Sequence, residues 1–314
     1  MDLEPYRGEL VAYCYRMLGS FHEAEDLVQE TMLRAWKARE RYDASRASVR
    51  TWVYRIATNV CLTALEGRAR RPLPSGLGAP SGDPGAPLTP AFDIPWLQPF
   101  PDARYDVEVR ADLRLALVAA MQVLPARQRA VLVLREVLEF SAAEVAEQLG
   151  TTVAAVNSSL QRARAAIADA GDPGEVPEPD DAKAREVVQQ YARAFEAADV
   201  PALVRLLTDA AVLEMPPVPL WYRGRRDYGL FLDRVFALRG TGWVTRQLTA
   251  GGQPALAAYA PAPAPEGGYR LHTLQVFTVA GGRVAHNVVF ADPPVFEAFD
   301  LPGEISRDEF RRPR

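Results

Sequence analysis

Cysteine, histidine and long apolar runs are all scarce in this chain of 314 residues. Its two cysteines, Cys14 and Cys61, each lie in an apolar helical pattern, and two isolated thiols provide neither a zinc site nor a disulfide framework. The start of the chain lacks the basic and then apolar pattern of a signal peptide, and no apolar run is long enough to span a bilayer. The sequence therefore predicts a cytoplasmic protein that uses no metal and no cofactor.

An excess of positive charge is also missing. Lysine and arginine number 36 against 40 aspartates and glutamates, which gives a net charge of −4. This balance excludes a protein that coats nucleic acid without sequence preference, so any DNA contact must come from local basic patches or lean on a larger partner. The length predicts two or three domains, and the apolar content of 48% is ample for packed cores.

Residues 1–71 read as wholly helical. Apolar residues recur at helical spacing in a first helix, a Gly19-Ser20 break follows, and a third helix runs from about Val49 to Arg68. The second helix has a polar side opposite its apolar stripe. Charge spacing alone favours a solvated face, so this side is only a candidate surface, made of Asp26, Gln29, Glu30 and Arg34.

The third helix carries aromatic residues in what we take to be its polar phase, and a basic cluster at its end. Aromatic rings among arginine and asparagine are suited to stacking on unpaired bases while phosphates are held. The alternative is that Trp52 belongs to the core. The candidate nucleic-acid residues of this region are Trp52, Tyr54, Arg55, Asn59, Arg68, Arg70 and Arg71.

The segment from Phe140 to Arg164 predicts a helix-turn-helix. Gly150 supplies the permissive backbone for a tight turn, with Thr151 or Thr152 placed to cap the helix that follows. That helix is expected to bury Val153, Val156, Leu160, Ala163 and Ile167. Its other face is short, polar and basic, as insertion into a major groove requires, and consists of Thr152, Asn157, Ser158, Gln161, Arg162 and Arg164.

Two breaks divide the chain. Residues 72–106 are rich in proline and glycine and form a predicted linker, interrupted by an apolar island, WLQPFPD, whose tryptophan and phenylalanine must dock on something. Helices resume over residues 107–171, and an acidic proline-rich break follows. Residues 182–300 then begin with two helices and continue as strands, which indicates an α+β domain with a curved antiparallel sheet and helices on its concave side. Residues 301–314 form a tail.

Two segments resemble known transcription proteins. DLVQETMLRAW (Asp26 to Trp36) and TWVYRIATNVCL (Thr51 to Leu62) look like region 2 of bacterial sigma-70-type initiation factors. The stretch that opens with LPARQRAVLVLREV at Leu124 and runs through Arg164 is similar to region 4 of the same proteins. With only these two all-α regions, joined by a linker, the chain resembles the extracytoplasmic-function group. The resemblance implies a subunit that binds core RNA polymerase, recognises promoter DNA and helps to melt it.

The resemblance also implies a role for each candidate face. The polar side of the second helix would meet the clamp helices of the polymerase. The third helix would read the −10 element on an extruded base, and its terminal arginines would hold phosphates. The groove-facing helix would read the −35 element. Many relatives carry lysine or arginine near Asn157, where this chain has Asn-Ser-Ser, so phosphate contact is weaker there.

Residues 182–300 resemble the SnoaL-like branch of the nuclear-transport-factor-like cone fold. The matching segments are VVQQYARAFEAADVPALVRLL, VLEMPPVPLWYRG and TLQVFTVAGGRVAHNVVF, and the linker island is similar to a Trp-Leu-Pro motif of some sigma factors that end in such a domain. The resemblance implies regulation in cis, in which the domain docks on the sigma regions or their linker. Its docking candidates are Trp96, Leu97, Gly281, Gly282 and Arg283.

This fold also has a cavity that takes small molecules in some relatives. Catalysis there needs an acid or base paired with an oxyanion donor, and no sequence pattern establishes one, so we expect no catalytic residue. An unidentified small ligand remains a candidate partner. The expected cavity residues are Tyr191, Glu214, Trp221, Tyr222, His272, Gln275 and His286.

Two other functions were weighed against a sigma factor. One is a one-component helix-turn-helix regulator with a ligand-binding or vestigial enzymatic C-terminal domain, and the other is an enzyme with a DNA-binding appendage. Both leave residues 1–71, above all the face from Trp52 to Asn59, without a role. The promoter bases, the inducing signal and the existence of a separate anti-sigma protein stay open.

Overall fold

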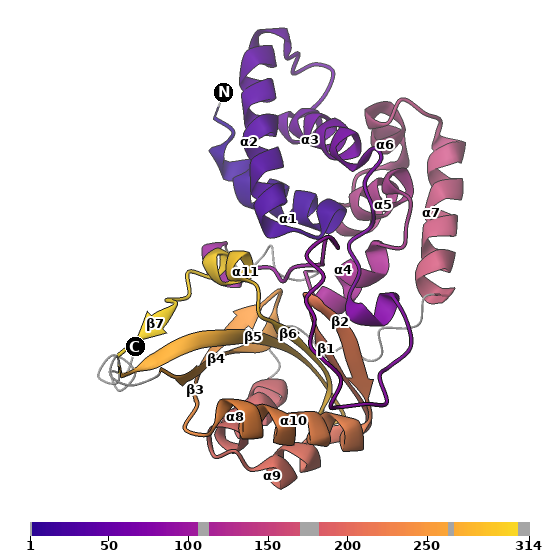
Figure 1. Ribbon diagram of the computed structural model, residues 1–314. Helices are drawn as coiled ribbons and strands as arrows, with labels where there is room; N and C mark the ends of the chain where they lie inside the picture. Colours follow the sequence, from indigo (N-terminus) through magenta and orange to yellow (C-terminus); the bar gives the residue numbers. More distant parts are fainter. Residues whose placement is uncertain (1, 106–112, 170–181, 263–266, 307–314) are drawn as a thin grey trace. The chain divides into compact units, whose positions relative to one another are not determined.

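The computed structural model of the chain describes all residues except 1, 106–112, 170–181, 263–266 and 307–314 (Figure 1). These residues form two compact units. The first comprises residues 1–71, 97–100 and 104–173, and the second comprises residues 72–96, 101–103 and 174–314. The predicted boundary at 106 and 107, the acidic break and most of the C-terminal tail lie outside the described residues. None of the described helices combines the length and apolar content needed to cross a bilayer.

The first unit is helical, as predicted. Its α-helices are α1 (Arg7–Leu18), α2 (Phe21–Ala38), α3 (Val49–Leu65), α4 (Leu115–Met121), α5 (Ala126–Leu132), α6 (Ala142–Gln148) and α7 (Val153–Asp169). A π-helical turn, η6 (Val133–Val137), continues α5, and short 3-10 turns occur at η1 (Glu4–Tyr6), η2 (Arg39–Arg41) and η4 (Asp102–Arg104), the last on the boundary of the two units.

Serine side chains begin several of these helices. Ser20 and Ser48 accept hydrogen bonds from the amides of Glu23 and Thr51 in the first turns of α2 and α3. Ser141 forms a capping box with Glu144 at the start of α6. Each cap satisfies an amide that the helix itself leaves without a partner, and this fixes where the helix begins.

The predicted helix-turn-helix is confirmed. Gly150 turns the chain with φ of 60°, and the Thr152 hydroxyl accepts a hydrogen bond from the amide of Ala155 at 3.2 Å, which makes Thr152 the cap of α7. Val156, Leu160 and Ala163 are buried as expected. The expected burial of Val153, the first residue of α7, is wrong: this residue is 45% exposed.

A buried arginine ties α5 to α1 within the first unit. Arg129 is 4% exposed, and its guanidinium donates to the carbonyl oxygens of Met17, Gln122 and Leu124. Burial without a carboxylate partner lowers the pKa of Arg129 to about 10. The group nevertheless stays charged at neutral pH because three carbonyl dipoles and the Gln122 amide oxygen surround it.

The second unit is an α+β domain. Its sheet contains β1 (Leu207–Met215), β2 (Val218–Arg223), β3 (Val244–Ala250), β4 (Gln253–Pro261), β5 (Tyr269–Ala280), β6 (Arg283–Phe290) and β7 (Glu304–Ile305). Its helices are α8 (Ala182–Glu196), α9 (Val200–Arg205), α10 (Arg225–Arg239) and α11 (Pro293–Ala298), with a 3-10 turn, η3 (Pro74–Gly76), in the linker.

The main strands lie in the order β2-β1-β6-β5-β4-β3, and α8, α9 and α10 fill the concave side of the curved sheet (Figure 1). One detail of the prediction is wrong: β1 pairs with β6 in parallel, so the sheet is mixed. Strands β2 to β5 lie between β1 and β6 in the chain. Strand β6 then returns to the side of β1 and runs in the same direction as β1.

Helix α10 was not predicted, although its apolar spacing was present. Tyr228, Phe231 and Phe236 are buried at helical intervals against the sheet. Gly229 lies on the side that faces α9, where a Cβ would come within 2.8 Å of the Val204 side chain. The close approach of the two helices thus requires glycine at a position that otherwise weakens a helix.

Candidate functional site

The polar face of α3 is narrower than the sequence indicated. Trp52 is half-buried and its ring lies 5.1 Å from that of Tyr42, while Arg55 and Asn59 are exposed one and two turns along the same side. Tyr54 is not part of this face. It is fully buried, because residues two apart on a helix point in nearly opposite directions. Its hydroxyl donates to Glu9.

The helices of region 4 cover one flank of this face within the first unit. The Thr51 hydroxyl donates to Glu144 at 3.3 Å, and Arg55 lies 3.9 Å from Glu147, so two carboxylates of α6 meet the start of α3. Arg50 also donates to the carbonyl of Leu138 at 3.2 Å. In this arrangement, two carboxylates of α6 lie beside the exposed polar residues of α3.

The basic cluster after α3 is engaged in ion pairs. Arg68 and Arg71 both bind Glu23 on α2, at 3.0 and 2.7 Å, while Arg70 is exposed. Burial lowers the pKa of Arg71, although the paired carboxylate opposes that shift. Two of the three arginines are therefore paired with a carboxylate, and their contact with DNA phosphates stays a prediction.

The predicted −35 residues are all exposed. Thr152 caps α7, and the others lie on that helix, at Asn157, Ser158, Gln161, Arg162 and Arg164. Arg162 donates to the hydroxyl of Ser159 at 3.1 Å, and Arg164 pairs with Glu136 at 2.7 Å. These two local contacts orient the basic groups along the helix. The centre of the exposed face of α7 carries the short polar side chains of Asn157 and Ser158.

The polar side of α2 also carries large apolar groups. Asp26, Gln29 and Arg34 are exposed, and Arg34 pairs with the half-buried Glu30 at 2.6 Å. Leu33 and Trp36 are 45% and 60% exposed beside them, a feature that sequence analysis missed. Exposed leucine and tryptophan among charged residues are typical of a protein-binding surface, whereas a merely solvated face has little use for them.

The apolar island of the linker does dock, as predicted. Leu97 and Phe100 are buried in the first unit, where Phe100 lies 5.1 Å from the ring of Tyr15 and the Gln98 carbonyl accepts from the Tyr15 hydroxyl. A Cβ on Gly19 would meet Leu97 at 2.7 Å, so this glycine makes room for the island.

The pairing of Trp96 with the β5–β6 turn stays a prediction. The indole nitrogen of Trp96 donates to the carbonyl of Ala91 within the linker, at 2.8 Å. Gly281, Gly282 and Arg283 are exposed on a hairpin turn, with open space around both glycines. A glycine turn needs no docking partner, because its positive φ angles alone account for the residue type.

The linker is instead attached along the β1–β2 edge of the sheet within the second unit. The buried Glu214 accepts from the Ser75 amide at 2.7 Å and from the Ser75 hydroxyl at 3.1 Å. His286 on β6 lies 2.7 Å from the same carboxylate. Glu214 therefore binds the linker with His286 beside it, and neither residue lines the cavity.

The edge strand β2 makes further contacts with the linker. The Ser81 amide donates to the Trp221 carbonyl at 2.8 Å, and the Trp221 indole donates to the Gly78 carbonyl at 3.0 Å. The Tyr222 hydroxyl reaches the Asp83 carbonyl at 3.4 Å. Trp221 and Tyr222, expected in the cavity, thus also belong to the attachment of the linker.

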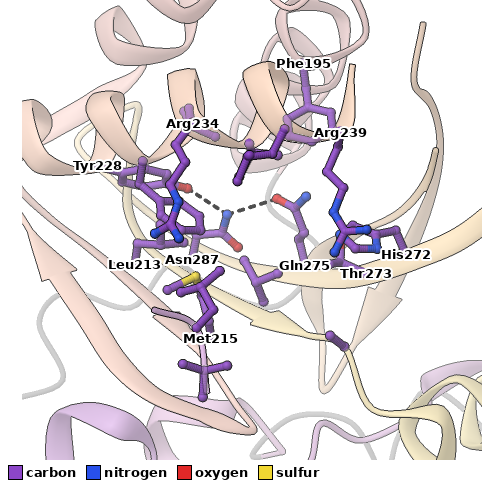
Figure 2. A pocket seen from close by; sticks show the side chains of 18 of the residues that line it. Phe195, Leu213, Met215, Tyr228, Arg234, Arg239, His272, Thr273, Gln275 and Asn287 are labelled. Atoms are coloured by element: carbon purple, nitrogen blue, oxygen red, sulfur yellow. Dashed lines mark hydrogen bonds between the residues drawn. The ribbon is translucent and has the colours of Figure 1, made fainter. Parts of the chain in front are cut away.

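The same strands form a cavity of about 290 Å³ on the helix-covered face of the sheet. Side chains alternate across a strand, so Leu213 and Met215 point into the cavity while Glu214 points away, and Asn287 points in while His286 points out. Tyr191, His272 and Gln275 line the cavity as predicted (Figure 2). Sequence analysis missed Asn287, because a single asparagine in a strand gives no signal until it is known which alternate residues of the strand face the cavity.

A row of hydrogen-bonded polar groups crosses the cavity wall. The Asn287 amide nitrogen donates to the Tyr228 hydroxyl at 2.7 Å and to Gln275 at 3.0 Å, and the Tyr191 hydroxyl lies 3.0 Å from that of Tyr228 (Figure 2). Burial, followed by the positive charge of Arg239, lowers the pKa of His272. Among the described lining residues there is no carboxylate to serve as an acid or base with this neutral imidazole.

Family models match most of this architecture. Sigma-70 region 2 matches residues 3–71, Sigma-70 region 4 matches residues 114–167, and the SnoaL-like domain matches residues 188–287. The ECF RNA polymerase sigma factor SigG of Mycobacterium tuberculosis is 47% identical over 314 residues, which cover 96% of this chain and 83% of SigG.

Two further relatives cover different portions. SigW, an ECF RNA polymerase sigma factor of Bacillus subtilis, is 32% identical over 165 residues, or 52% of this chain and 82% of SigW. The crystal structure of the extracytoplasmic function sigma factor SigJ of M. tuberculosis superposes with a TM-score of 0.66 at 24% identity, covering 96% of this chain and all of SigJ. Over 96% of this chain, the SnoaL-like domain included, the fold is therefore shared with a solved protein.

Proposed function

The chain belongs to the extracytoplasmic-function sigma factors of RNA polymerase. From that premise we propose which role each of its surfaces has when the chain directs promoter-specific transcription. In this proposal α2 binds the core enzyme, α3 reads the −10 element, α7 reads the −35 element and the SnoaL-like domain regulates in cis. The observation that carries it is the pair of exposed polar faces on α3 and α7 in a chain that matches both sigma regions.

The α2 surface supports contact with core polymerase. Asp26, Gln29 and Arg34 surround Leu33 and Trp36, so the surface offers an apolar centre with a charged rim. Such a composition is that of an interface, in which apolar groups supply affinity and charges set the register. We expect Leu33→Ala to weaken core binding about tenfold, whereas Leu230→Ala, at a similarly exposed leucine of the third domain, should not alter it.

The α3 and α7 faces support promoter recognition with different chemistry. On α3, Trp52 provides a ring for an unpaired base, with Arg55 and Asn59 beside it for phosphate and base-edge contacts. On α7, Asn157 and Gln161 are one turn apart at the centre of the groove-facing side, and both amides suit adenine. Because Glu144 and Glu147 meet the start of α3, region 4 must move off α3 when promoter DNA binds.

The attachment of the linker supports regulation in cis. Residues 75–91 join the two promoter-reading regions and are bound by β1, β2 and α10 of the SnoaL-like domain, where Arg234 donates to the carbonyls of Pro84 and Ala86 at 2.8 and 2.7 Å. A linker held along its length limits how far the two regions can separate. The domain thereby sets the ease with which the chain spans the −10 and −35 elements.

Transcription in vitro with core RNA polymerase tests the proposal. Trp52→Ala should reduce open complexes, and Asn157→Ala should reduce initiation or change the −35 bases selected, each with an effect of about 1–3 kcal/mol. Val123→Ala, at an exposed apolar residue outside these faces, is the matched control. Arg234→Ala should change the yield of transcript without changing the promoters used. Core binding by the folded chain that yields no specific initiation would refute the proposal.

A further inference from the structure

An acceptor without a partner lies in the wall of the SnoaL-like cavity. Asn287 is 1% exposed, and its amide nitrogen is fully used by Tyr228 and Gln275. Its Oδ1 atom is buried and has no hydrogen-bond partner among the described residues. Asn287 is one of the residues that line the cavity (Figure 2). A buried carbonyl with no donor is unfavourable, so the site is incomplete without a molecule that brings an O–H or N–H group.

The remaining lining defines the rest of that molecule. Most of it is aliphatic or aromatic, and the volume of about 290 Å³ is near the lower end of the range for ligand pockets. Arg234 and Arg239 are the charged groups contributed by α10, and no carboxylate occurs among the described lining residues. This charge pattern excludes a cationic ligand and favours a small, mainly apolar molecule that is neutral or anionic.

The linker forms part of the cavity. Leu88, Pro90 and Phe92 line it together with the strands and α10. Phe92 is 77% exposed and Leu88 is 39% exposed, so these apolar side chains are only partly covered at the rim. A molecule in the cavity would contact them and bury more of their surface. Occupancy of the cavity and seating of the linker are therefore linked.

We propose that the SnoaL-like cavity binds a small, mainly apolar compound bearing a hydroxyl or N–H donor, which binds Asn287 Oδ1, and that binding holds linker residues 88–92 in place. This inference deepens the proposed regulation in cis and rests on it for its consequence in transcription. The ligand is then the signal that sets how firmly the linker is held.

Binding of 2-naphthol to the full chain tests the proposal, with 2-methoxynaphthalene as the matched probe. The two share the apolar rings, but only 2-naphthol can donate to Asn287. Saturable binding followed by naphthol fluorescence should favour 2-naphthol about tenfold, the change expected for one buried hydrogen bond. In Asn287→Leu the preference should fall to about onefold, because the acceptor is gone.

Phe92→Ala provides a variant with little risk to folding, since this side chain is largely exposed. It should weaken binding of both probes about threefold to tenfold by removing apolar contact area. Leu230→Ala, at an exposed residue of α10 outside the cavity lining, is its control. Saturating 2-naphthol should also slow chymotrypsin cleavage after Phe92 in the parent chain.

The outcomes separate cleanly. Preference for 2-naphthol that is lost in Asn287→Leu, together with weaker binding in Phe92→Ala, supports the proposal. Absence of saturable binding by 2-naphthol, equal binding of the two probes, or an unchanged preference in folded Asn287→Leu overturns it. Because the sigma activity of the same preparation is measured in transcription without either probe, failure of ligand binding and failure of the proposed function are told apart.

Discussion

The attachment of the linker through Glu214 makes a quantitative prediction. This carboxylate is fully buried and accepts from both the amide and the hydroxyl of Ser75. Glu214→Gln keeps the shape but removes the negative charge and replaces one acceptor oxygen with an NH₂ group. With the amide oxygen on the Ser75 amide, the Ser75 hydroxyl and His286 both lose their charged acceptor. The loss should be about 1–3 kcal/mol. Ser75→Ala removes only the hydroxyl bond, at 3.1 Å, for about 1 kcal/mol.

These free energies translate into populations of the chain with an opened linker. At about 1.4 kcal/mol for each factor of ten, Ser75→Ala should raise the population of the opened linker about fivefold, and Glu214→Gln by up to about 150-fold. Chymotrypsin reports this population by cleavage after Leu77, two residues beyond Ser75, provided that cleavage is slow compared with closing.

The ranking of the two variants is the decisive result. A cleavage rate in folded Glu214→Gln within twofold of the parent would show that the carboxylate does not hold the linker. So would faster cleavage in Ser75→Ala than in Glu214→Gln. Circular dichroism of each variant, together with an unchanged cleavage pattern elsewhere in the chain, is the control for folding.

Three other predictions concern buried or shared groups. The hydrogen bond to Cys14 and burial raise the pKa of the Cys61 thiol, so both cysteines should resist thiol reagents in the native chain and react on unfolding; rapid native labelling would contradict this. Burial lowers the pKa of His272 below its ordinary 6.5, so stability present above that value is lost as the pH falls below it. Urea midpoints of His272→Gln should accordingly vary less between about pH 7 and pH 5 than those of the parent, and parallel profiles would refute the assignment. Arg50→Ala removes the bond to the Leu138 carbonyl, so hydrogen exchange at the start of α6 should quicken by about fivefold, and unchanged exchange would mean that this contact does not hold region 4 against α3.

Local patterns explain what the sequence predicted well. Ser48, Ser141, Gly150 and Thr152 act within a few residues of their own position, so the helix starts and the recognition turn follow from short motifs. The strands β3 to β6 follow from apolar runs bounded by turns. By contrast, the prolines before and inside β2 disguised that strand, since proline is tolerated in a sheet only at an edge.

Errors arose where the answer depends on phase or on distant partners. Tyr54 was grouped with Trp52, although two residues along a helix amount to a rotation of about 200° and place the rings on opposite sides. Glu214 and His286 were assigned to the cavity. Alternate residues of a strand face opposite sides of the sheet, and the sequence alone did not show which set faces the helices until the strand pairing was known. Glu23, which engages two arginines more than 40 residues away, had no local signal at all.

The position of the linker beside β2 has a consequence for solubility. Strand β2 ends the sheet, and its outer carbonyl at Trp221 is bonded by the Ser81 amide of the linker. When the linker leaves, that strand offers unpaired backbone groups to any extended chain nearby, including β2 of a second molecule. We therefore expect a chain whose linker is released to self-associate more readily through β2.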